Sequence, residues 1–181
     1  MDKQQEIELV TNCQHGDKKA LDTLVRLLEK SVYNAAYRML GNPDEAADVT
    51  QTTFLKVFEN IGGFNPKFRL FSWTYRIALN ESIDQLKRRE RTKPLEHMPI
   101  SDTDSPQETV ALSQLSDEVQ STLMELKEEH RSVIVLRYFS DCSYEDIGRI
   151  LQLPEKTVKS RLFSARQQLK NKLNQHGVYS S

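Results

Sequence analysis

Six lysine and arginine side chains and a single acid, Glu155, occupy one predicted helix near the C-terminus. The cations are Lys156, Lys159, Arg161, Arg166, Lys170 and Lys172. Cations in this number neutralise phosphate groups, so the helix is suited to bind a nucleic-acid backbone. Thr157, Ser160 and Ser164 lie between them, and short polar side chains at such positions can reach base edges in a major groove. The pattern indicates DNA binding, with a solvated amphipathic helix as the alternative.

Residues 143–172 as a whole predict a helix-turn-helix. Ser143 can cap the first helix, and Asp146 lies three residues later, as in a capping box. After a turn near residues 152–153, Pro154 suits the first turn of the second helix, because its fixed φ is helical. The second helix has one apolar stripe at a 3.6-residue period, formed by Val158, Leu162, Ala165, Leu169 and Leu173. The capped helix, short turn and basic helix occur in the order of a DNA-reading motif.

A second basic helix is predicted from about Ser72 to Arg91. One side of it is apolar, and the other presents polar side chains at helical spacing: Arg76, Asn80, Asp84, Lys87 and Arg88. Asparagine and aspartate among arginines and lysines suit base-edge contacts inside a set of phosphate contacts. A plain polar solvent face is the alternative for this helix.

Helical periodicity dominates the chain and no alternating strand pattern is convincing, so we expect an all-α fold. A first long helix is predicted from about Lys18 to Met39, and Gly41-Asn42-Pro43 ends it. A second helix is predicted from about Asp44 to Ile61, followed by a loop rich in phenylalanine. The side chains of this second helix expected to face inward are Ala47, Phe54, Phe58 and Ile61. The C-terminal module is predicted from about residue 115, with a core of Leu123, Leu126, Val133, Ile134, Leu136 and Tyr138.

Residues 92–120 contain three prolines and five more acidic than basic side chains. Such a composition buries too little apolar surface to offset the ordering of its backbone, so we interpret it as an acidic linker. The chain then divides into two small helical domains, residues 1–91 and 121–181. The linker has about 29 residues, which at roughly 3.3 Å each reach at most ~95 Å. About 24 base pairs at roughly 3.4 Å each span about 80 Å, so the linker is long enough for one monomer to contact two DNA sites at that separation.

The remaining composition excludes several classes of protein. Cys13 and Cys142 lie far apart with no CxxC, and the four histidines are isolated, so neither a disulfide framework nor a metal site is indicated. Gly-rich phosphate loops and hydrolase motifs are missing, so we predict no catalytic residue and no cofactor. No apolar run approaches the roughly 20 residues that cross a bilayer, and the N-terminus lacks a signal-peptide core. We expect a cytoplasmic protein without membrane insertion.

Three segments, in this order, closely resemble the extracytoplasmic-function (ECF) group of bacterial sigma factors. They are GNPDEAADVTQTTFLKVF, FSWTYRIALNESIDQLKRR and LPEKTVKSRLFSARQQL, and the resemblance covers roughly residues 17–174. It implies a subunit of core RNA polymerase that recognises promoter DNA and aids strand opening. The N-terminal module, region 2, would bind the β′ clamp helices and open the −10 element. The C-terminal module, region 4, would read the −35 element and rest on the β flap, with the linker in the RNA exit channel. A stand-alone helix-turn-helix regulator is the alternative.

The resemblance also implies three groups of site residues. Those facing the polymerase are Asp48, Gln51, Thr52 and Lys56. Those facing the −10 DNA are Arg76, Asn80, Asp84 and Arg88, with Phe64, Asn65, Pro66, Lys67 and Phe68 in a loop that captures a flipped base. Those facing the −35 groove are Glu155, Lys156, Thr157, Lys159, Ser160, Arg161 and Arg166. A core role is the alternative for Phe64 and Phe68, and Trp73 is expected in the core rather than as a melting wedge.

The chain departs from the family pattern at Ala47 and Thr52, where members usually carry an acid. Two missing negative charges weaken complementarity to a basic polymerase surface. A phosphate on Thr50, Thr52 or Thr53 would add about −1.5 to −2 charges, and Thr52 is the first candidate. A Ser/Thr kinase is therefore one expected partner. The alternative is control by an anti-sigma factor, the family's usual inhibitor, with Thr52 as a tolerated surface residue.

Overall fold

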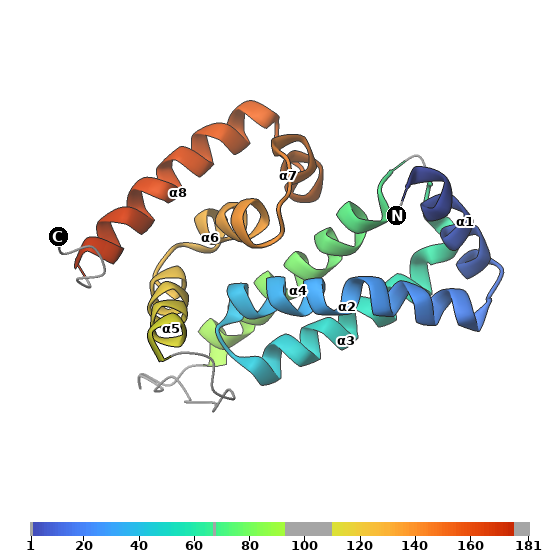
Figure 1. The fold of residues 1–181 in the computed structure, drawn as a ribbon, viewed down its shortest axis with the longest axis horizontal. Helices are drawn as coiled ribbons and strands as arrows, with labels where there is room; N and C mark the ends of the chain where they lie inside the picture. The colour runs from blue at the N-terminus through green and yellow to red at the C-terminus, as the bar shows by residue number, and fades with distance from the viewer. Residues whose placement is uncertain (1, 67, 93–109, 176–181) are drawn as a thin grey trace.

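The computed structural model describes residues 2–66, 68–92 and 110–175, and within these ranges the fold is all-α, as expected (Figure 1). The α-helices are α1 (Lys3–Gln14), α2 (Lys18–Leu40), α3 (Pro43–Asn60), α4 (Leu70–Thr92), α5 (Val110–Met124), α6 (Glu128–Ile134), α7 (Tyr144–Leu151) and α8 (Glu155–Gln175). A 3-10 helix, η1 (Ile61–Gly63), follows α3, and a π-helix, η2 (Val135–Phe139), follows α6. The predicted long helices are confirmed to within two residues at their ends.

The N-terminal lobe, α1 to α4, is built on a bundle of α2, α3 and α4 (Figure 1). Its buried side chains include Leu24, Val32 and Met39 of α2, Val57 of α3 and Leu79 of α4. The chain leaves α2 through Gly41, whose φ of 66° is left-handed and suits a residue without Cβ. The Asn42 side chain then accepts from the Glu45 amide at 3.0 Å, and Pro43 opens α3. The predicted break between the first two long helices is confirmed.

The C-terminal lobe, α5 to α8, contains the helix-turn-helix. The Ser143 hydroxyl accepts from the Asp146 amide at 3.1 Å and starts α7. Gln152 turns the chain with φ 55°, and the Pro154 carbonyl accepts the first main-chain bonds of α8. Four of the five residues in the predicted apolar stripe of α8 are buried, and Leu169 is partly buried: the four are Val158, Leu162, Ala165 and Leu173. The helix-turn-helix prediction is confirmed.

Two predicted core positions are wrong. Ala47 is exposed, because α3 turns its neighbours Ala46 and Val49 inward and places residue 47 about 100° away around the helix. Tyr138 is 55% exposed. It lies in the π-turn η2, where the wider turn shifts side chains away from the 3.6-residue period that predicted its burial.

The two cysteines are buried free thiols, and burial raises the pKa of Cys142 to about 12.

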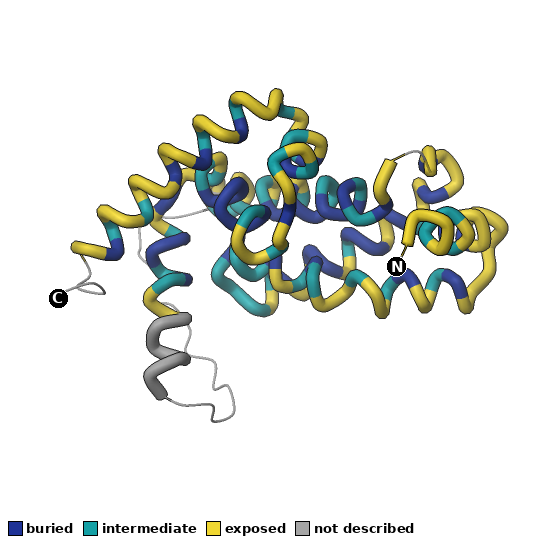
Figure 2. The backbone as a smooth tube through the Cα atoms, turned by 45° about the horizontal axis from the view of Figure 1, so that its top comes forward, coloured by how far each residue is buried: buried dark blue, intermediate teal, exposed yellow. Residues whose placement is uncertain are grey.

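The lobes pack against each other along two contacts (Figures 1 and 2). α2 contacts α5, α6 and η2, and α4 contacts α7. In the first contact, Gln120 of α5 accepts from Arg38 at 2.9 Å and donates to the Tyr37 carbonyl at 3.3 Å. Most of the predicted linker, residues 93–109, lies outside the described residues, and α5 begins at Val110 within it. The division at residues 91 and 121 stays a prediction.

Candidate nucleic-acid interface

The outer face of α8 is exposed along its length and carries the predicted −35 residues (Figure 2). Lys159 is 2.7 Å from Glu155, and this hydrogen bond raises the pKa of Lys159. Its ammonium also lies 5.6 Å from the ring centre of Tyr144. The exposed members of the group are Glu155, Lys156, Lys159, Ser160 and Arg166, while Thr157 and Arg161 are half-buried. Most of these side chains can therefore contact a DNA groove without any rearrangement of the lobe.

The predicted −10 side of α4 faces the C-terminal lobe across a cleft of about 430 Å³. Arg76, Asn80 and Asp84 line one wall, while Arg88 is exposed. The opposite wall includes Glu128, Glu129, Gln152 and Arg161. With its oxygen turned toward Arg76, the Gln152 amide accepts from both guanidinium nitrogens at 2.7 and 3.1 Å. The arrangement thus brings three of the four predicted helix residues together and covers them in part with the other lobe.

The loop between η1 and α4 separates the two phenylalanines predicted there. Phe64 is buried, with its ring centre 4.8 Å from that of Trp73, so both residues belong to the core of the lobe. Phe68 is 62% exposed, and Asn65 is also exposed. Lys67 lies outside the described residues. The structure therefore leaves Phe68 as the aromatic ring free to stack on a base.

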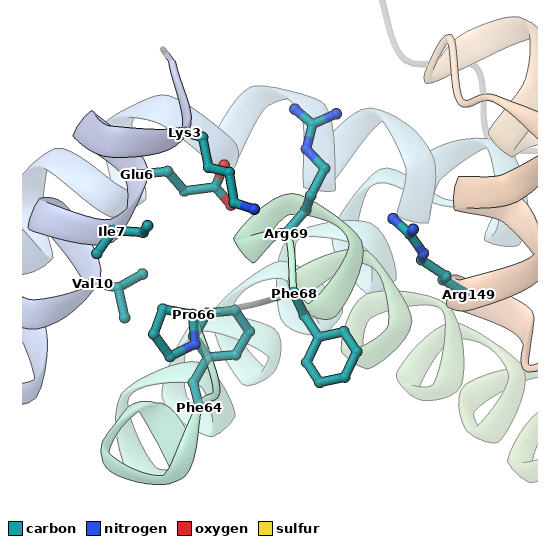
Figure 3. Close-up of a pocket in the computed structure, with 9 residues that line it drawn as sticks. All are labelled: Lys3, Glu6, Ile7, Val10, Phe64, Pro66, Phe68, Arg69 and Arg149. Atoms are coloured by element: carbon teal, nitrogen blue, oxygen red, sulfur yellow. The ribbon is translucent and has the colours of Figure 1, made fainter.

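A cavity of about 310 Å³ adjoins this loop (Figure 3). Its lining residues are Lys3, Glu6, Ile7 and Val10 of α1, Phe64, Pro66, Phe68 and Arg69 of the loop, and Arg149 of α7. Figure 3 shows the α1 side chains beside Phe64 and Pro66, with Phe68 and Arg69 pointing in opposite directions from the loop. Aromatic and apolar walls beside cations are a chemical environment in which an unpaired base and its phosphate can bind.

The predicted polymerase face lies on α3, on the side away from the bundle core. Asp48, Gln51 and Lys56 are exposed and Thr52 is half-buried. Lys56 forms an ion pair with Glu81 of α4. The neighbouring threonines differ: Thr50 and Thr53 are buried, and their hydroxyls donate to the carbonyls four residues earlier, both at 2.7 Å. Of these three threonines, Thr52 is therefore the most accessible to solvent.

Sequence reasoning missed α1 and the two side chains that join it to the loop. Gln14 donates to the main-chain carbonyls of Ile61 at 2.9 Å and Phe64 at 3.0 Å, and Glu6 accepts from the Leu70 amide. A signal was present, because Asp2 and Gln5 form a capping box at the start of α1. The bonds made by Gln14 span about fifty residues of sequence, and no local pattern indicates them.

Comparison with known proteins gives consistent matches over both lobes. A model of sigma-70 region 2 matches residues 24–92, and one of sigma-70 region 4 matches residues 116–169. The ECF RNA polymerase sigma factor SigW of Bacillus subtilis is 32% identical over 170 residues, covering 87% of this chain and 91% of that protein. The ECF RNA polymerase sigma-E factor of Haemophilus influenzae is 33% identical over 177 residues, covering 91% and 93%.

Two solved structures align with most of this chain, across both lobes. The structure of CnrH in complex with the cytosolic domain of CnrY aligns with a TM-score of 0.75 at 25% identity, covering 96% of this chain and 98% of that one. The sigma factor RpoE of Bartonella quintana, in complex with the anti-sigma factor NepR, aligns with a TM-score of 0.73 at 24% identity, covering 86% and 98%. The similarity to the Bartonella quintana protein supports the fold alone.

Among the helices of the described residues, none combines the length and the apolar composition that a membrane span requires.

Proposed function

Because this chain belongs to the extracytoplasmic-function (ECF) family of RNA polymerase sigma factors, we propose that its two lobes read two separate promoter elements. The chain is a non-enzymatic polymerase subunit that directs transcription initiation. One observation carries the finer proposal: a single chain has two basic helices on different lobes, α4 and α8, each with polar side chains among its cations. A stand-alone regulator needs only one such helix.

In this proposal the C-terminal lobe reads the −35 element with α8. Phosphates are bound by Lys156 and Lys159 in the first turns of the helix and by Arg166 in its middle, because all three side chains are exposed. Thr157, Ser160 and Arg161 reach base edges from the first two turns of α8, as recognition helices do. Glu155 accepts from Lys159 and fixes its direction in the free protein.

The N-terminal lobe reads and opens the −10 element with α4 and the loop before it. Asn80 and Asp84 contact base edges, Arg76 and Arg88 contact phosphates, and Phe68 stacks on an unpaired base. The cleft between the lobes, at about 430 Å³, has the volume of a small-molecule pocket and no room for a DNA duplex, and Gln152 accepts from Arg76 across it. The lobes therefore separate when the chain binds promoter DNA, and the acidic linker allows that separation.

Core RNA polymerase binds the exposed side of α3 through Asp48, Gln51, Thr52 and Lys56. We assign the β′ clamp helices to this face and the β flap to the C-terminal lobe, by analogy with the family, and we place the chain in the cytoplasm with the polymerase. Ala47 and Leu55, both exposed, give the same face an apolar part. With Ala47 and Thr52 uncharged, the face is less acidic than the family's usual pattern implies.

Thr52 is the residue whose modification would restore that charge. Thr50 and Thr53 are excluded as kinase sites in the folded protein, because both hydroxyls are buried and bonded to carbonyls. A phosphate on Thr52 would add about −1.5 to −2 charges beside Asp48, one turn earlier on α3. A Ser/Thr kinase would thus activate the chain. An anti-sigma factor, the inhibitor usual in this family, is the second proposed controller. The similar protein CnrH was solved in complex with another protein, the cytosolic domain of CnrY, and we propose a comparable complex for this chain.

Run-off transcription tests the proposal. Purified core polymerase is incubated with genomic DNA fragments, with and without this chain, and the transcripts are sequenced. Discrete start sites that appear only with the chain, preceded by shared −35 and −10 sequences, would support it. Sequence-specific binding of the isolated chain to DNA, without transcripts in the presence of core, would favour the stand-alone regulator instead.

A further inference from the structure

The side chain of Gln14, the last residue of α1, holds the start of the loop that precedes α4. Its amide nitrogen donates to the carbonyls of Ile61 at 2.9 Å and Phe64 at 3.0 Å. The Phe64 amide in turn donates to the Ile61 carbonyl at 3.1 Å, which closes the 3-10 turn η1. An NH₂ group has two donors, so Gln14 satisfies both carbonyls at once. A carboxylate of the same shape has no donor and would face two carbonyl oxygens.

Glu6, on the same helix, holds the other end of the loop. Its carboxylate accepts from the amide of Leu70, the first residue of α4. The amides of a first helical turn have no partner within the helix, and a negative charge there is favoured by the helix dipole. One helix therefore fixes both the point where the loop leaves η1 and the point where it enters α4.

Between these two attachments, α1 supplies one wall of the 310 Å³ cavity (Figure 3). Ile7 and Val10 give an apolar surface opposite Phe64 and Pro66. The charged side chains of the lining are three cations, Lys3, Arg69 and Arg149, and one acid, Glu6, so positive charge prevails. A pocket with apolar and aromatic walls and nearby cations suits a planar base attached to a phosphate backbone. The described residues offer no duplex-sized groove at this place, so an unpaired base fits better than a base pair.

We propose that α1 is part of the strand-opening apparatus, with Gln14 as a positioning residue that shapes a pocket for one unpaired base of the promoter. The sigma-70 region 2 match begins at residue 24 and does not include this helix. The proposal rests on the proposed function, in which the loop before α4 captures a base from the opened strand. It adds that the pocket is shared between α1 and the loop, and that its shape depends on the two bonds from Gln14.

Gln14→Glu tests this, with Gln4→Glu as the matched control. Both substitutions exchange an amide for a carboxylate on α1, but Gln4 is exposed and makes none of the loop contacts. Each variant is assembled with core polymerase on a promoter found in the run-off assay. Strand opening is followed by 2-aminopurine fluorescence at successive −10 positions. We expect Gln14→Glu to slow opening about tenfold, a loss in line with two disrupted hydrogen bonds, and Gln4→Glu to open like the wild type.

A second template separates positioning of the pocket from a general loss of stability. Templates lacking the base at the captured position remove the group that the pocket binds, so wild type and Gln14→Glu should then open at the same rate. A tenfold difference that persists on the abasic template, or equal rates on the intact one, would overturn the proposal. If the wild-type holoenzyme opens intact and abasic promoters equally well at every position, the base-capture function itself fails, whatever Gln14 does.

Discussion

Arg131 of α6 donates from its guanidinium to the main-chain carbonyl of Met39, near the end of α2, at 2.6 Å. Helix C-termini leave carbonyls without intrahelical partners, and here the other lobe supplies one. Arg131 is 5% exposed, and burial lowers its pKa to about 10. Its remaining nitrogens donate to the carbonyls of Leu123, Met124 and Leu126, all at 2.8 Å. One side chain thus ties the turn between α5 and α6 to the N-terminal lobe.

Replacing Arg131 with methionine should destabilise the protein strongly. The substitution keeps an unbranched apolar stem but removes the guanidinium, so four carbonyls lose this donor, and buried acceptors that lose a partner are costly. We expect a loss of about 3 kcal/mol in the free energy of unfolding, measured by urea denaturation. Arg26→Met is the control, because Arg26 forms an exposed ion pair with Asp22 on α2 and should cost well under 1 kcal/mol. Equal losses in the two variants would contradict this reading of Arg131.

Gln120→Ala should favour separation of the lobes while leaving each lobe folded. Gln120 makes both of its inter-lobe bonds to α2, to Arg38 and to the Tyr37 carbonyl. Their loss should weaken docking by about 1 to 2 kcal/mol. The expected results are a larger radius of gyration in small-angle X-ray scattering and tighter binding of a −10 single strand to the uncovered α4. Gln167→Ala, at an exposed position of α8, should change neither measurement. Tighter docking or weaker strand binding in Gln120→Ala would contradict the prediction.

The features of this molecule that the sequence predicted correctly depend on residues that lie close together in the chain. The cap at Ser143, the stop at Gly41 and the apolar stripe of α8 each depend on residues a few positions apart, and all are confirmed. The errors have equally local causes. Helical spacing to Phe54 predicts Ala47 in the core, whereas the family pattern predicts the same position on the polymerase face, and the structure exposes it.

Long-range bonds account for what sequence reasoning could not supply. Gln14 bonds residues 47 and 50 positions away, and Arg131 bonds Met39 across 92 positions. A glutamine at a helix end, and an arginine two residues after a pair of glutamates, look like solvent-exposed residues in any local window. The docking of α7 on α4 is likewise set by packing between lobes, so the partial cover over the −10 residues could not be read from their spacing.

Lys159→Ala should weaken binding of the −35 element and flatten its salt dependence. Lys159 is exposed on the outer face of α8, so its removal deletes one phosphate contact and lowers the slope of log K against log salt by about 1. Holoenzyme binding to −35 DNA is measured by fluorescence anisotropy across a salt series. Lys30→Ala, which removes an exposed cation of α2, should leave the slope unchanged. Arg161→Ala should instead relax base preference. An unaltered salt slope in Lys159→Ala together with an unaltered −35 preference in Arg161→Ala would refute the assignment of this face.

Thr52→Glu should strengthen binding of core polymerase, and Thr52→Ala should abolish any response to phosphorylation. Thr52 lies one turn after Asp48 and one turn before Lys56, so a negative charge there extends the acidic part of the α3 face. A glutamate at residue 52 also lies four residues before Lys56, which is the favourable order for an i,i+4 ion pair. It would therefore compete with Glu81 for Lys56. A carboxylate carries less charge than a phosphate, so we expect a gain of a few-fold in affinity, roughly 0.5 to 1 kcal/mol, reduced by added salt.

The control for this prediction is Thr23→Glu, an equal change of charge at an exposed position of α2. Binding of labelled core polymerase and run-off transcription are compared for the three variants and the wild type. If Thr52→Glu and Thr52→Ala both behave like the wild type, charge at this position does not control the chain. An anti-sigma factor then becomes the controller to seek. If Thr23→Glu gains as much affinity for core polymerase as Thr52→Glu, the effect comes from net charge and not from the α3 face. A binding site on α3 would make the two substitutions differ.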